Sequence, residues 1–401
     1  MSAGAQRTGP LQIAYVTETY PPEINGVANT VQHAVRWLRG RGHAVQLVRP
    51  RQPSDSGGEQ RLEPAPEILT GGMPIPLYPD LRMGFARPHR LVREWRRQRP
   101  DLVHIATEGP LGWAALRAAQ RLGIPSSSDF RTNFHLYSAH YGFGMVQPVA
   151  LAYLRWFHNA TGLTTVPTRA LRASLLDDGF RNLAVVGRGV DTALFSPARR
   201  SEALRASWGA GPEDVVVLHV GRLAPEKNVG LALRTHAAIA RECPRARLVL
   251  VGDGPARTAV MIAGTGAVFM GWRRGEELAR CYASADLFVF PSMTETFGNV
   301  VLEALASGLV VVAYDHGAAG EHVRDGTDGL LARFGDPGHF IAQGVRAALD
   351  VQARNAMRRE ARALAERLGW EVILQGLERV LRQAAAARPA PAESAYAARP
   401  R

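Results

Sequence analysis

The chain has 401 residues, of which 46% are hydrophobic, and a formal net charge of +12. This length and hydrophobic content predict two domains, each with its own core. No apolar run is long enough to cross a bilayer, and the first residues carry no secretory signal. The two cysteines, Cys243 and Cys281, lack metal or redox spacing, which is typical of the reducing cytosol.

The positive charge does not by itself indicate a nucleic-acid-binding protein. The arginines are scattered through predicted helices, and no basic module with the aromatic pattern of nucleic-acid binding is present. Among the 48 Lys and Arg residues, Lys227 is the only lysine. A lysine kept in so arginine-biased a chain suggests a position that needs a compact ammonium group, with chance survival as the alternative.

Strand and helix patterns alternate from the start of the chain, which predicts an α/β fold. A strand over residues 11–17 precedes a proline-rich loop, a helix over about 28–39 and a strand over 44–48. Gly26 ends that loop and has no side chain to keep a phosphate or sugar from the backbone, although an ordinary turn glycine is equally compatible with the pattern. Residues 50–80, rich in Pro, Gly and charge, are predicted to be a mobile loop.

The stretch from Arg82 to Arg99 mixes arginines with apolar and aromatic residues. One interpretation is a segment that rests on an anionic membrane surface through its arginines. The alternative is a helix whose outer face is solvated and whose Leu91, Val92 and Trp95 pack inward.

Polar and aromatic residues follow the next predicted strand and helix pair, at 101–105 and 111–122. They include Arg131 and His135, and they lie where a parallel sheet places its ligands, just past a strand end. His135 is a candidate acid, base or hydroxyl partner, although a lone histidine is more often structural.

The domain junction is predicted near residues 187–200, after short strands at 164–167 and 184–186. We therefore expect an N-terminal domain over 1–190 and a C-terminal domain over 191–370. A helix over 371–387 would follow and pack back on the N-terminal domain, and the low-complexity tail over 388–401 is predicted to be disordered.

The C-terminal half opens with a strand over 215–220 and a loop that carries Arg222 and Lys227 before a helix begins near Asn228. Two cations beside a helix start suit a diphosphate. The alternative is a surface ion pair in which Glu226 neutralises Lys227. Further on, Trp272 and Arg273 follow a short strand and are candidates for holding a base.

Residues 286–321 form a strand–loop–helix–strand unit with two acids, Glu295 in the loop and Glu303 in the helix. Acids beside a helix start can bind hydroxyls while the helix start binds a phosphate. A pair of hydrolytic acid and base carboxylates remains the alternative for these two residues.

The motif from Glu295 to Gly308, with GRLAPEKN, VGDGP and YPPEINGV at matching places, resembles retaining glycosyltransferases of family 4. The resemblance extends over about residues 11–380. It implies the GT-B fold, two Rossmann-like domains that face a cleft. Within the family the chain is similar to bacterial GDP-mannose-dependent α-mannosyltransferases that act on glycolipids.

The resemblance implies a role for each matching residue. Arg222 and Lys227 would hold the donor diphosphate, Glu303 the ribose hydroxyls and Glu295 the donor sugar. The remaining donor contacts would come from the backbone of Gly26, Phe297, Gly298 and Asn299, and from the base-binding Trp272 and Arg273. Many relatives carry a histidine where Arg131 stands here, so the resemblance leaves open whether Arg131 or His135 takes the catalytic role of the N-terminal domain.

No Asp-x-Asp pair stands where a metal-bound diphosphate would need one, so we expect no metal and no cofactor beyond the nucleotide-sugar substrate. The expected partners are GDP-mannose or a UDP-sugar, a glycolipid or lipid-linked acceptor, and the inner face of the cytoplasmic membrane as a peripheral surface, with no nucleic acid. Alternatives within the fold are a UDP-sugar-dependent transferase, a sugar-nucleotide epimerase or phosphorylase, and a non-catalytic membrane-surface protein.

Overall fold

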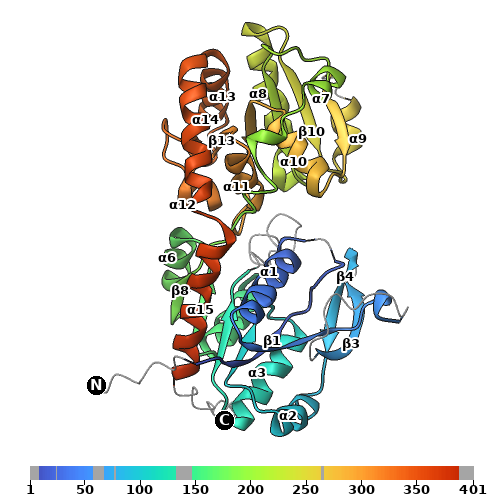
Figure 1. The fold of residues 1–401 in the computed structure, drawn as a ribbon, viewed down its shortest axis with the longest axis vertical. Coiled ribbons are helices and arrows are strands. Elements are labelled where there is room, and N and C mark those ends of the chain that lie inside the picture. Colours follow the sequence, from blue (N-terminus) through green and yellow to red (C-terminus); the bar gives the residue numbers. More distant parts are fainter. Residues whose placement is uncertain are drawn as a thin grey trace. The chain divides into compact units, whose positions relative to one another are not determined.

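The computed structural model describes residues 9–23, 25–56, 67–75, 78–131, 147–262 and 266–387. The contacts within the chain divide it into two compact units, coloured along the sequence in Figure 1. Of the described residues, unit 1 comprises those up to Gly187 and those from Leu374 onward, and unit 2 comprises Arg188–Ile373.

Unit 1 contains an eight-stranded sheet in the order β4-β3-β2-β1-β5-β6-β7-β8. Every neighbouring pair is parallel except β3 and β4, which form an antiparallel pair at one edge. The strands are β1 Gln12–Val16, β2 Ala44–Pro50, β3 Glu67–Ile75, β4 Tyr78–Phe85, β5 Leu102–Ile105, β6 Ser126–Asp129, β7 Leu163–Val166 and β8 Leu183–Val185.

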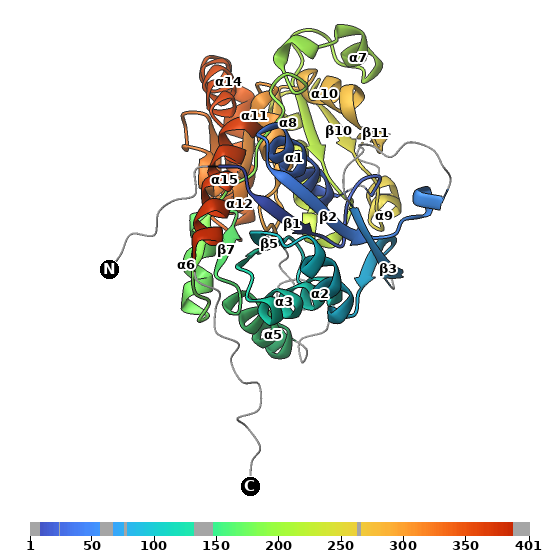
Figure 2. The same ribbon diagram turned by 60° about the horizontal axis from the view of Figure 1, so that its bottom comes forward.

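The helices of unit 1 connect successive parallel strands, as a βαβ arrangement requires. Figure 2 shows α2 and α3 side by side, and their apolar side chains share one core with β1 and β5. The helices are α1 Gly26–Gly40, α2 Pro88–Arg97, α3 Pro110–Leu122, α5 Gln147–Asn159, α6 Arg169–Asp177 and most of α15 Trp370–Ala386, with a short 3-10 turn at Pro53–Ser56.

The prediction of a loop over residues 50–80 is wrong for most of its described part. β3 and the start of β4 occupy this region, and β3 pairs with both β2 and β4. Its turn-forming residues are compatible with a strand because Gly72 lies close to β2, where an added Cβ would be 2.8 Å from Cβ of Pro50. Residues 57–66 of the predicted loop, and the predicted tail over 388–401, lie outside the described residues.

The basic stretch from Arg82 to Arg99 includes the end of β4 and the whole of α2. Of the two interpretations of this stretch, the inward packing of its apolar residues is confirmed, because Leu91 and Trp95 are fully buried and Val92 packs against the same core. Nε1 of Trp95 donates a hydrogen bond to Gln46 on β2. The arginines of α2 are exposed.

The C-terminal helix α15 packs on unit 1 through a polar contact at its centre. The carboxylate of Glu378 lies 3.2 Å from Nε2 of His43 and accepts a hydrogen bond from Arg382, which also donates to the carbonyl of Gly9. Nδ1 of His43 accepts from the backbone N–H of Leu11. This contact ties the last helix to the beginning of the first strand.

Unit 2 contains a six-stranded, fully parallel sheet in the order β11-β10-β9-β12-β13-β14. The strand predictions at residues 247–251 and 287–290 match β10 and β12 residue for residue. The strands are β9 Val216–Val220, β10 Arg247–Val251, β11 Val268–Gly271, β12 Leu287–Phe290, β13 Val310–Tyr314 and β14 Gly329–Ala332.

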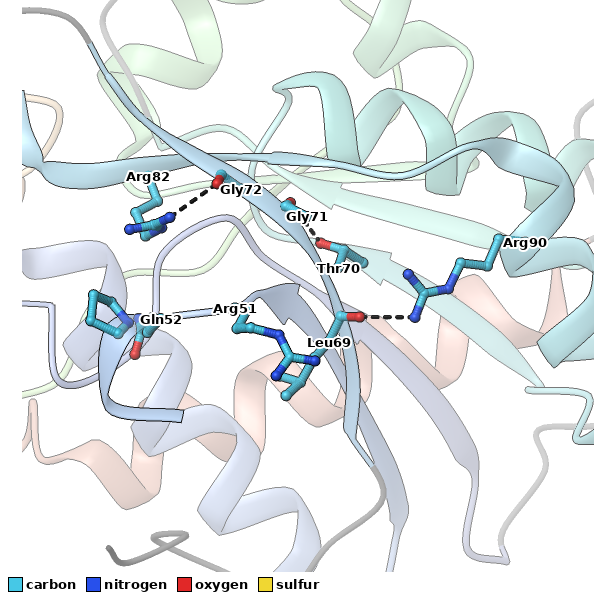
Figure 3. A pocket seen from close by; sticks show the side chains of 9 residues that line it. Arg51, Gln52, Leu69, Thr70, Gly71, Gly72, Arg82 and Arg90 are labelled. Carbon is cyan, nitrogen blue, oxygen red and sulfur yellow. Dashed lines mark hydrogen bonds between the residues drawn. The ribbon is translucent and has the colours of Figure 1, made fainter. Parts of the chain in front are cut away.

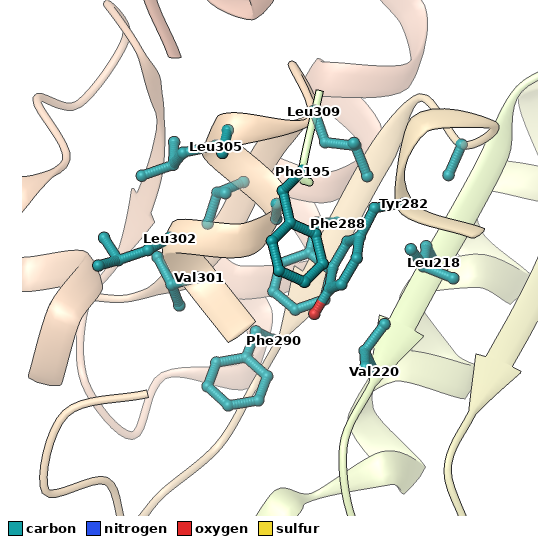
Figure 4. Close-up of a cluster of buried hydrophobic side chains, with 14 of the residues drawn as sticks. Phe195, Leu218, Val220, Tyr282, Phe288, Phe290, Val301, Leu302, Leu305 and Leu309 are labelled. Carbon is teal, nitrogen blue, oxygen red and sulfur yellow. The ribbon is translucent and has the colours of Figure 1, made fainter. Parts of the chain in front are cut away.

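Two apolar cores cover the two faces of this sheet, since alternate residues of each strand point to opposite faces. Phe288 and Phe290 belong to the core that includes α10, α11 and α14 (Figure 4), and Leu287 and Val289 to the one that includes α8 and α13. The helices are α7 Glu202–Ser207, α8 Val229–Glu242, α9 Arg257–Ile262, α10 Gly275–Ala283, α11 Asn299–Ala306, α12 Gly317–His322, α13 Pro337–Leu349 and α14 Val351–Glu366, with 3-10 turns at Pro197–Arg199 and Pro225–Lys227.

Each sheet has one place where the strand order reverses. In unit 1 this switch point lies between β1 and β5, and in unit 2 between β9 and β12. In open parallel sheets ligands bind outside the carboxyl ends of the strands at such a point, because the connections leave it in opposite directions. Among the described residues, no helix is long and apolar enough to cross a membrane.

Candidate functional site

The loops after β9 and β12 meet at the switch point of unit 2. The two strands pair directly, with Leu218 opposite Phe288, so their loops emerge side by side at the carboxyl edge of the sheet. The backbone N–H of Met293 donates a 3.0 Å hydrogen bond to the carbonyl of Glu226, which joins one loop to the other. Residues 68 positions apart in the chain are therefore held in one place.

Lys227 and Glu295 form an ion pair across these loops. Both side chains are largely buried, with exposures of 15% and 14%. Oε1 of Glu295 also accepts a 2.8 Å hydrogen bond from Oγ of Ser292, and Nζ of Lys227 lies 5.8 Å from the centre of the Phe290 ring. An ammonium group has three donors, so Lys227 can hold Glu295 and still donate to an anion.

The loop between Glu295 and α11 is fixed from behind by a neighbouring helix. Gly298 has φ +97°, which a glycine adopts without strain, and it directly precedes the helix. The Phe297 side chain is buried, and its carbonyl accepts a hydrogen bond from the N–H of Ala318 at the start of α12. A Cβ on Gly317 would come within 2.6 Å of that same carbonyl, so the close approach of α12 depends on this glycine.

The start of α11 has the properties of an anion site. No side chain caps it, and its first turn carries no acid. Its first residue, Asn299, has a buried Oδ1 with no hydrogen-bond partner among the described residues, and this oxygen can accept from a hydroxyl group but not from an anion. Free N–H groups and the helix dipole favour a negatively charged group at such a start.

Glu303 lies one turn into α11, on the side of Tyr282. The Tyr282 hydroxyl donates a 2.9 Å hydrogen bond to Oε2 of Glu303. Burial raises the pKa of Glu303 to about 7, and the hydrogen bond from Tyr282 opposes that rise only in part. A carboxyl group with this pKa changes charge near neutral pH, so its hydrogen bonding to hydroxyl groups is sensitive to pH.

Arg222, Trp272 and Arg273 follow strands of the same sheet. Arg222 is half-buried in the loop after β9, beside Lys227 in sequence. Trp272 and Arg273 follow β11, two strands away from β9, and Trp272 is 56% exposed. The guanidinium of Arg273 donates to the carbonyl of Trp272 and lies 3.9 Å from the carboxylate of Glu277.

His219 was missed by the sequence analysis. It is fully buried in β9 below the loops of the site, and its ring stacks on Phe290. Nδ1 lies 3.0 Å from the carbonyl of Val289, which can only accept, so Nδ1 carries the proton. Burial lowers the pKa of His219 to about 4, and the ring is neutral at physiological pH. Only the pairing of β9 with β12 could have revealed this position.

In unit 1, Arg131 is used by a buried polar network. Its guanidinium donates to Asp129, which also contacts His104 at 3.2 Å and Thr165. Burial alone would raise the pKa of Asp129, but the charge of Arg131 and the contacts with His104 outweigh burial and hold that pKa well below its usual range. Arg131 therefore has a structural partner in this protein.

Of the other two candidates in unit 1, Gly26 lies within the described residues and His135 does not. Gly26 is the exposed first residue of α1, directly after Asn25, whose side chain accepts from the N–H of Ala28 and caps the helix.

The structure thus brings Lys227, Glu295, Phe297, Gly298 and Asn299 together at one switch point, with Glu303 one turn further along α11. Arg222 lies in the same loop as Lys227, and Trp272 and Arg273 lie along the same sheet edge. In the described part of the chain, no group of three or more His, Cys, Asp or Glu side chains is placed to hold a metal ion.

The fold of the two units is that of GT-B glycosyltransferases. A crystal structure of Alr3699/HepE from Anabaena in complex with UDP and glucose aligns with a TM-score of 0.71 at 22% identity, covering 93% of this chain and 100% of the other. This likeness concerns the fold alone and defines a class of enzymes with two parallel-sheet α/β domains.

Sequence comparison identifies the family. The family described as Glycosyltransferase Family 4 matches residues 24–194, and Glycosyl transferases group 1 matches residues 214–350. A GDP-mannose-dependent alpha-mannosyltransferase of Mycobacterium tuberculosis is 34% identical over 370 residues, 92% of this chain and 95% of that one. An alpha-monoglucosyldiacylglycerol synthase of Streptococcus pneumoniae is 27% identical, covering 80% and 75%. The chain belongs to glycosyltransferase family 4 and is a hexosyltransferase, as its motifs predicted.

Proposed function

We propose that this protein transfers mannose from GDP-mannose to a glycolipid or lipid-linked acceptor with retention of configuration. The observation that carries the proposal is the site of unit 2, where the Lys227–Glu295 pair lies in the loops beside the uncapped start of α11. The mannosyltransferase relative, similar over nearly its whole length, supports the choice of donor.

The charges of the site fit the leaving group of such a reaction. Breaking the bond between the anomeric carbon and the diphosphate oxygen leaves negative charge on the diphosphate. Lys227, Arg222 and the N–H groups at the start of α11 would stabilise that charge, since preorganised donors lower the barrier where charge develops. In this role the two cations would stand in for a metal ion, and no metal or further cofactor would be needed.

The acids would bind hydroxyl groups. Glu295, fixed by Ser292 and Lys227, would accept from the hydroxyls of the donor sugar. Glu303, hydrogen-bonded to Tyr282, would accept from the ribose. The departing phosphate oxygen would take the proton of the acceptor hydroxyl, which attacks the anomeric carbon on the same face.

A UDP-sugar donor is the second candidate. The structural neighbour of Anabaena was solved with UDP and glucose. Of the two residues that would hold the base, Trp272 is exposed and Arg273 is half-buried, and a planar ring such as Trp272 can stack on either guanine or uracil.

The acceptor is proposed to be a lipid because of α2 and of one relative. Four arginines of α2 and the arginine directly before this helix are exposed. Each could contribute about 1 kcal/mol of attraction to an anionic membrane. They are Arg87, Arg90, Arg93, Arg96 and Arg97. The alpha-monoglucosyldiacylglycerol synthase relative makes a glycolipid, by its name. We therefore propose peripheral binding to the inner face of the cytoplasmic membrane.

The test is an assay of the purified protein with GDP-mannose, UDP-glucose and other donors in the presence of membrane lipid extract, with products identified by mass spectrometry. A mannolipid formed from GDP-mannose supports the proposal. Conversion of the donor into an isomeric sugar nucleotide in the absence of an acceptor would indicate an epimerase. Absence of turnover of every donor would refute transferase activity under this proposal.

The Glu295→Ala variant locates the reaction. We expect transfer to fall to background while GDP still binds, because the diphosphate contacts remain. Glu213→Ala, which removes an exposed acid before β9, is the matched control and should leave transfer unchanged. Full activity of Glu295→Ala would contradict the assignment of the site.

A further inference from the structure

Unit 1 contains a cavity of about 440 Å³ lined by three arginines and by no acid (Figure 3). Arg51 follows β2, Arg82 lies on β4 and Arg90 on α2, so three different elements supply the guanidinium groups. Figure 3 shows Arg51 and Arg90 both extending toward Leu69, with Arg82 beside Gly72.

Within the described residues, the guanidinium groups of this cavity form no ion pair with a carboxylate. Arg51 lies within reach of the charge of Asp55, which Arg49 already pairs. Arg82 and Arg90 donate instead to backbone carbonyls of β3, those of Gly72 and Leu69. Arg51 forms no ion pair with a described carboxylate. The acids around β2 are engaged elsewhere, since Arg49, outside the cavity, pairs with both Asp55 and Glu67.

Two polar atoms of lining residues are buried without a hydrogen-bond partner in the described structure. They are Nε of Arg82, a donor, and Oε1 of Gln52, an acceptor. Nε2 of Gln52 donates to the carbonyl of Tyr20, which fixes the amide so that Oε1 is the atom left over. A buried polar atom without a partner costs free energy, so a ligand that supplies both an anionic oxygen and a hydroxyl would complete this site.

The cavity adjoins the carboxyl edge of the sheet. Arg51 and Gln52 directly follow β2, and the hydrogen bond from Gln52 to Tyr20 connects the cavity to the loop after β1. This is the edge at which parallel sheets bind ligands. Glu23, on the same loop, hydrogen-bonds Thr19 and lies within reach of the charge of Arg82 without forming an ion pair with it.

We propose that this cavity binds the oxyanion, a phosphate or a carboxylate, of a hydroxylated acceptor head group. Its volume lies within the range of roughly 300–1,000 Å³ that small-molecule sites occupy, which is enough for one sugar-sized group. The inference rests on the proposed function in one respect, that unit 1 takes the acceptor. It adds that the acceptor is anionic, with Arg51, Arg82 and Arg90 as the residues that select it.

The first experiment measures binding of soluble probes to the full-length protein by calorimetry at constant ionic strength. The probes are inorganic phosphate, glucose 6-phosphate, glucuronate and uncharged glucose. We expect glucose 6-phosphate or glucuronate to bind more tightly than phosphate, and glucose to bind at least tenfold more weakly. Equal binding of glucose and its anionic derivatives would overturn the proposal.

Matched arginine variants decide whether the cavity is the site. Arg90→Ala and Arg93→Ala remove the same charge from the same helix, but only Arg90 lines the cavity. We expect Arg51→Ala and Arg90→Ala each to weaken probe binding about tenfold, as loss of one charge-assisted contact would, and Arg93→Ala to leave it unchanged. For Arg82 the variant is Arg82→Lys, because a lysine can still contact β3 from β4. This variant keeps the charge but loses the forked donor geometry. An equal loss in Arg93→Ala would overturn the proposal.

A lipid source of the anion is tested separately with vesicles of phosphatidylcholine, with and without phosphatidylglycerol. If the cavity holds a lipid head group, Arg51→Ala weakens vesicle binding more than Arg93→Ala does. Binding to anionic vesicles that both variants weaken equally, together with no binding of the soluble probes, would assign these arginines to general surface attraction and overturn the proposal.

Transfer assays separate this inference from the proposed function. If the wild type transfers sugar and the cavity variants keep the wild-type KM for every acceptor in the lipid extract, the inference fails while the function stands. If probe binding depends on the three arginines but no donor is turned over, the function fails and the anion site stands. The expected result is a raised acceptor KM with an unchanged donor KM.

Discussion

The two units have the same kind of switch point but treat the adjoining helix start in opposite ways. In unit 1 the carboxyl group of Glu18, after β1, accepts a 2.8 Å hydrogen bond from the N–H of Leu111 at the start of α3. In unit 2 no side chain caps the start of α11. One switch point therefore satisfies its helix start with a side chain of its own, whereas the other leaves its helix start open.

The charged side chains follow the same division. Arg131 in unit 1 is held by Asp129 in a closed network with His104. Lys227 in unit 2 pairs with Glu295 in the loops beside the uncapped start of α11. Topology thus supplies a possible site in each unit, and local side chains decide which helix start stays open.

The largest effect is expected from Arg131→Ala, which tests whether the network of unit 1 is structural. Removing Arg131 leaves Asp129 as a buried charge, which costs about 3–5 kcal/mol of stability. Urea unfolding followed by fluorescence would measure the loss, and GDP affinity should stay at the wild-type value. If Arg131→Ala kept its stability but lost transfer, Arg131 would be catalytic and the contrast between the units would fail.

Lys227→Ala tests the opposite half of the comparison. Loss of one preorganised donor to the leaving diphosphate should lower kcat/KM by about 10²–10³-fold. Stability should fall as well, because Glu295 loses its partner in a largely buried ion pair. Lys227→Arg should also weaken donor binding if the compact ammonium is needed. The control is Arg245→Ala, which removes a charge that is 78% exposed. Arg245 lies before β10, at the amino ends of the strands and away from the loops of the site. Wild-type donor affinity in Lys227→Arg would mean that the lone lysine is accidental.

Glu18→Gln tests whether the carboxyl group of Glu18, at the start of α3, is held protonated by burial. Burial raises the pKa of Glu18 from 4.5 to about 8. The folded protein keeps this proton to higher pH than the unfolded chain, so the stability of the wild type falls as the pH rises from about 4.5 to about 8.

Glu18→Gln should therefore raise the melting temperature by several degrees above pH 8, and by less at pH 5. The amide oxygen can still accept from Leu111. Thermal unfolding at the two pH values measures the difference, with the exposed Glu213→Gln as control. A pH-independent difference would show that the carboxyl of Glu18 is not held protonated.

The smallest effect is expected for the change of GDP affinity with pH in unit 2. The pKa of Glu303 is about 7 because of burial, so the carboxyl is protonated below that pH and accepts ribose hydroxyls poorly. GDP affinity of the wild type should rise as the pH increases from 6 to 8, by at most about tenfold per unit below the pKa. Glu303→Gln should bind more weakly at pH 8 and show a flat profile. A wild-type profile that is flat would remove Glu303 from the nucleotide site.

Much of the fold was predictable because parallel strands leave strong local signals. The buried apolar run from Leu287 to Phe290 is short and ends at a proline, and the run of β10 ends at a glycine-rich turn, so length and flanking residues identify both as strands. β3 was missed because Gly71, Gly72 and Pro74 resemble a loop, and only pairing with β2 and β4 makes a strand of them. The cavity of the three arginines was missed for the same reason, since β3 is its wall.

The sequence by itself determined the family, the two α/β domains and the identity of the residues around Glu295, because spacing and residue type are local properties of the chain. Only the tertiary structure decided which of these side chains meet. Pairing of β9 with β12 brought Lys227 to Glu295 and placed His219 below them. The antiparallel edge of unit 1 gathered three arginines around one cavity. Strand order is set by packing between distant segments, and no local pattern contains it.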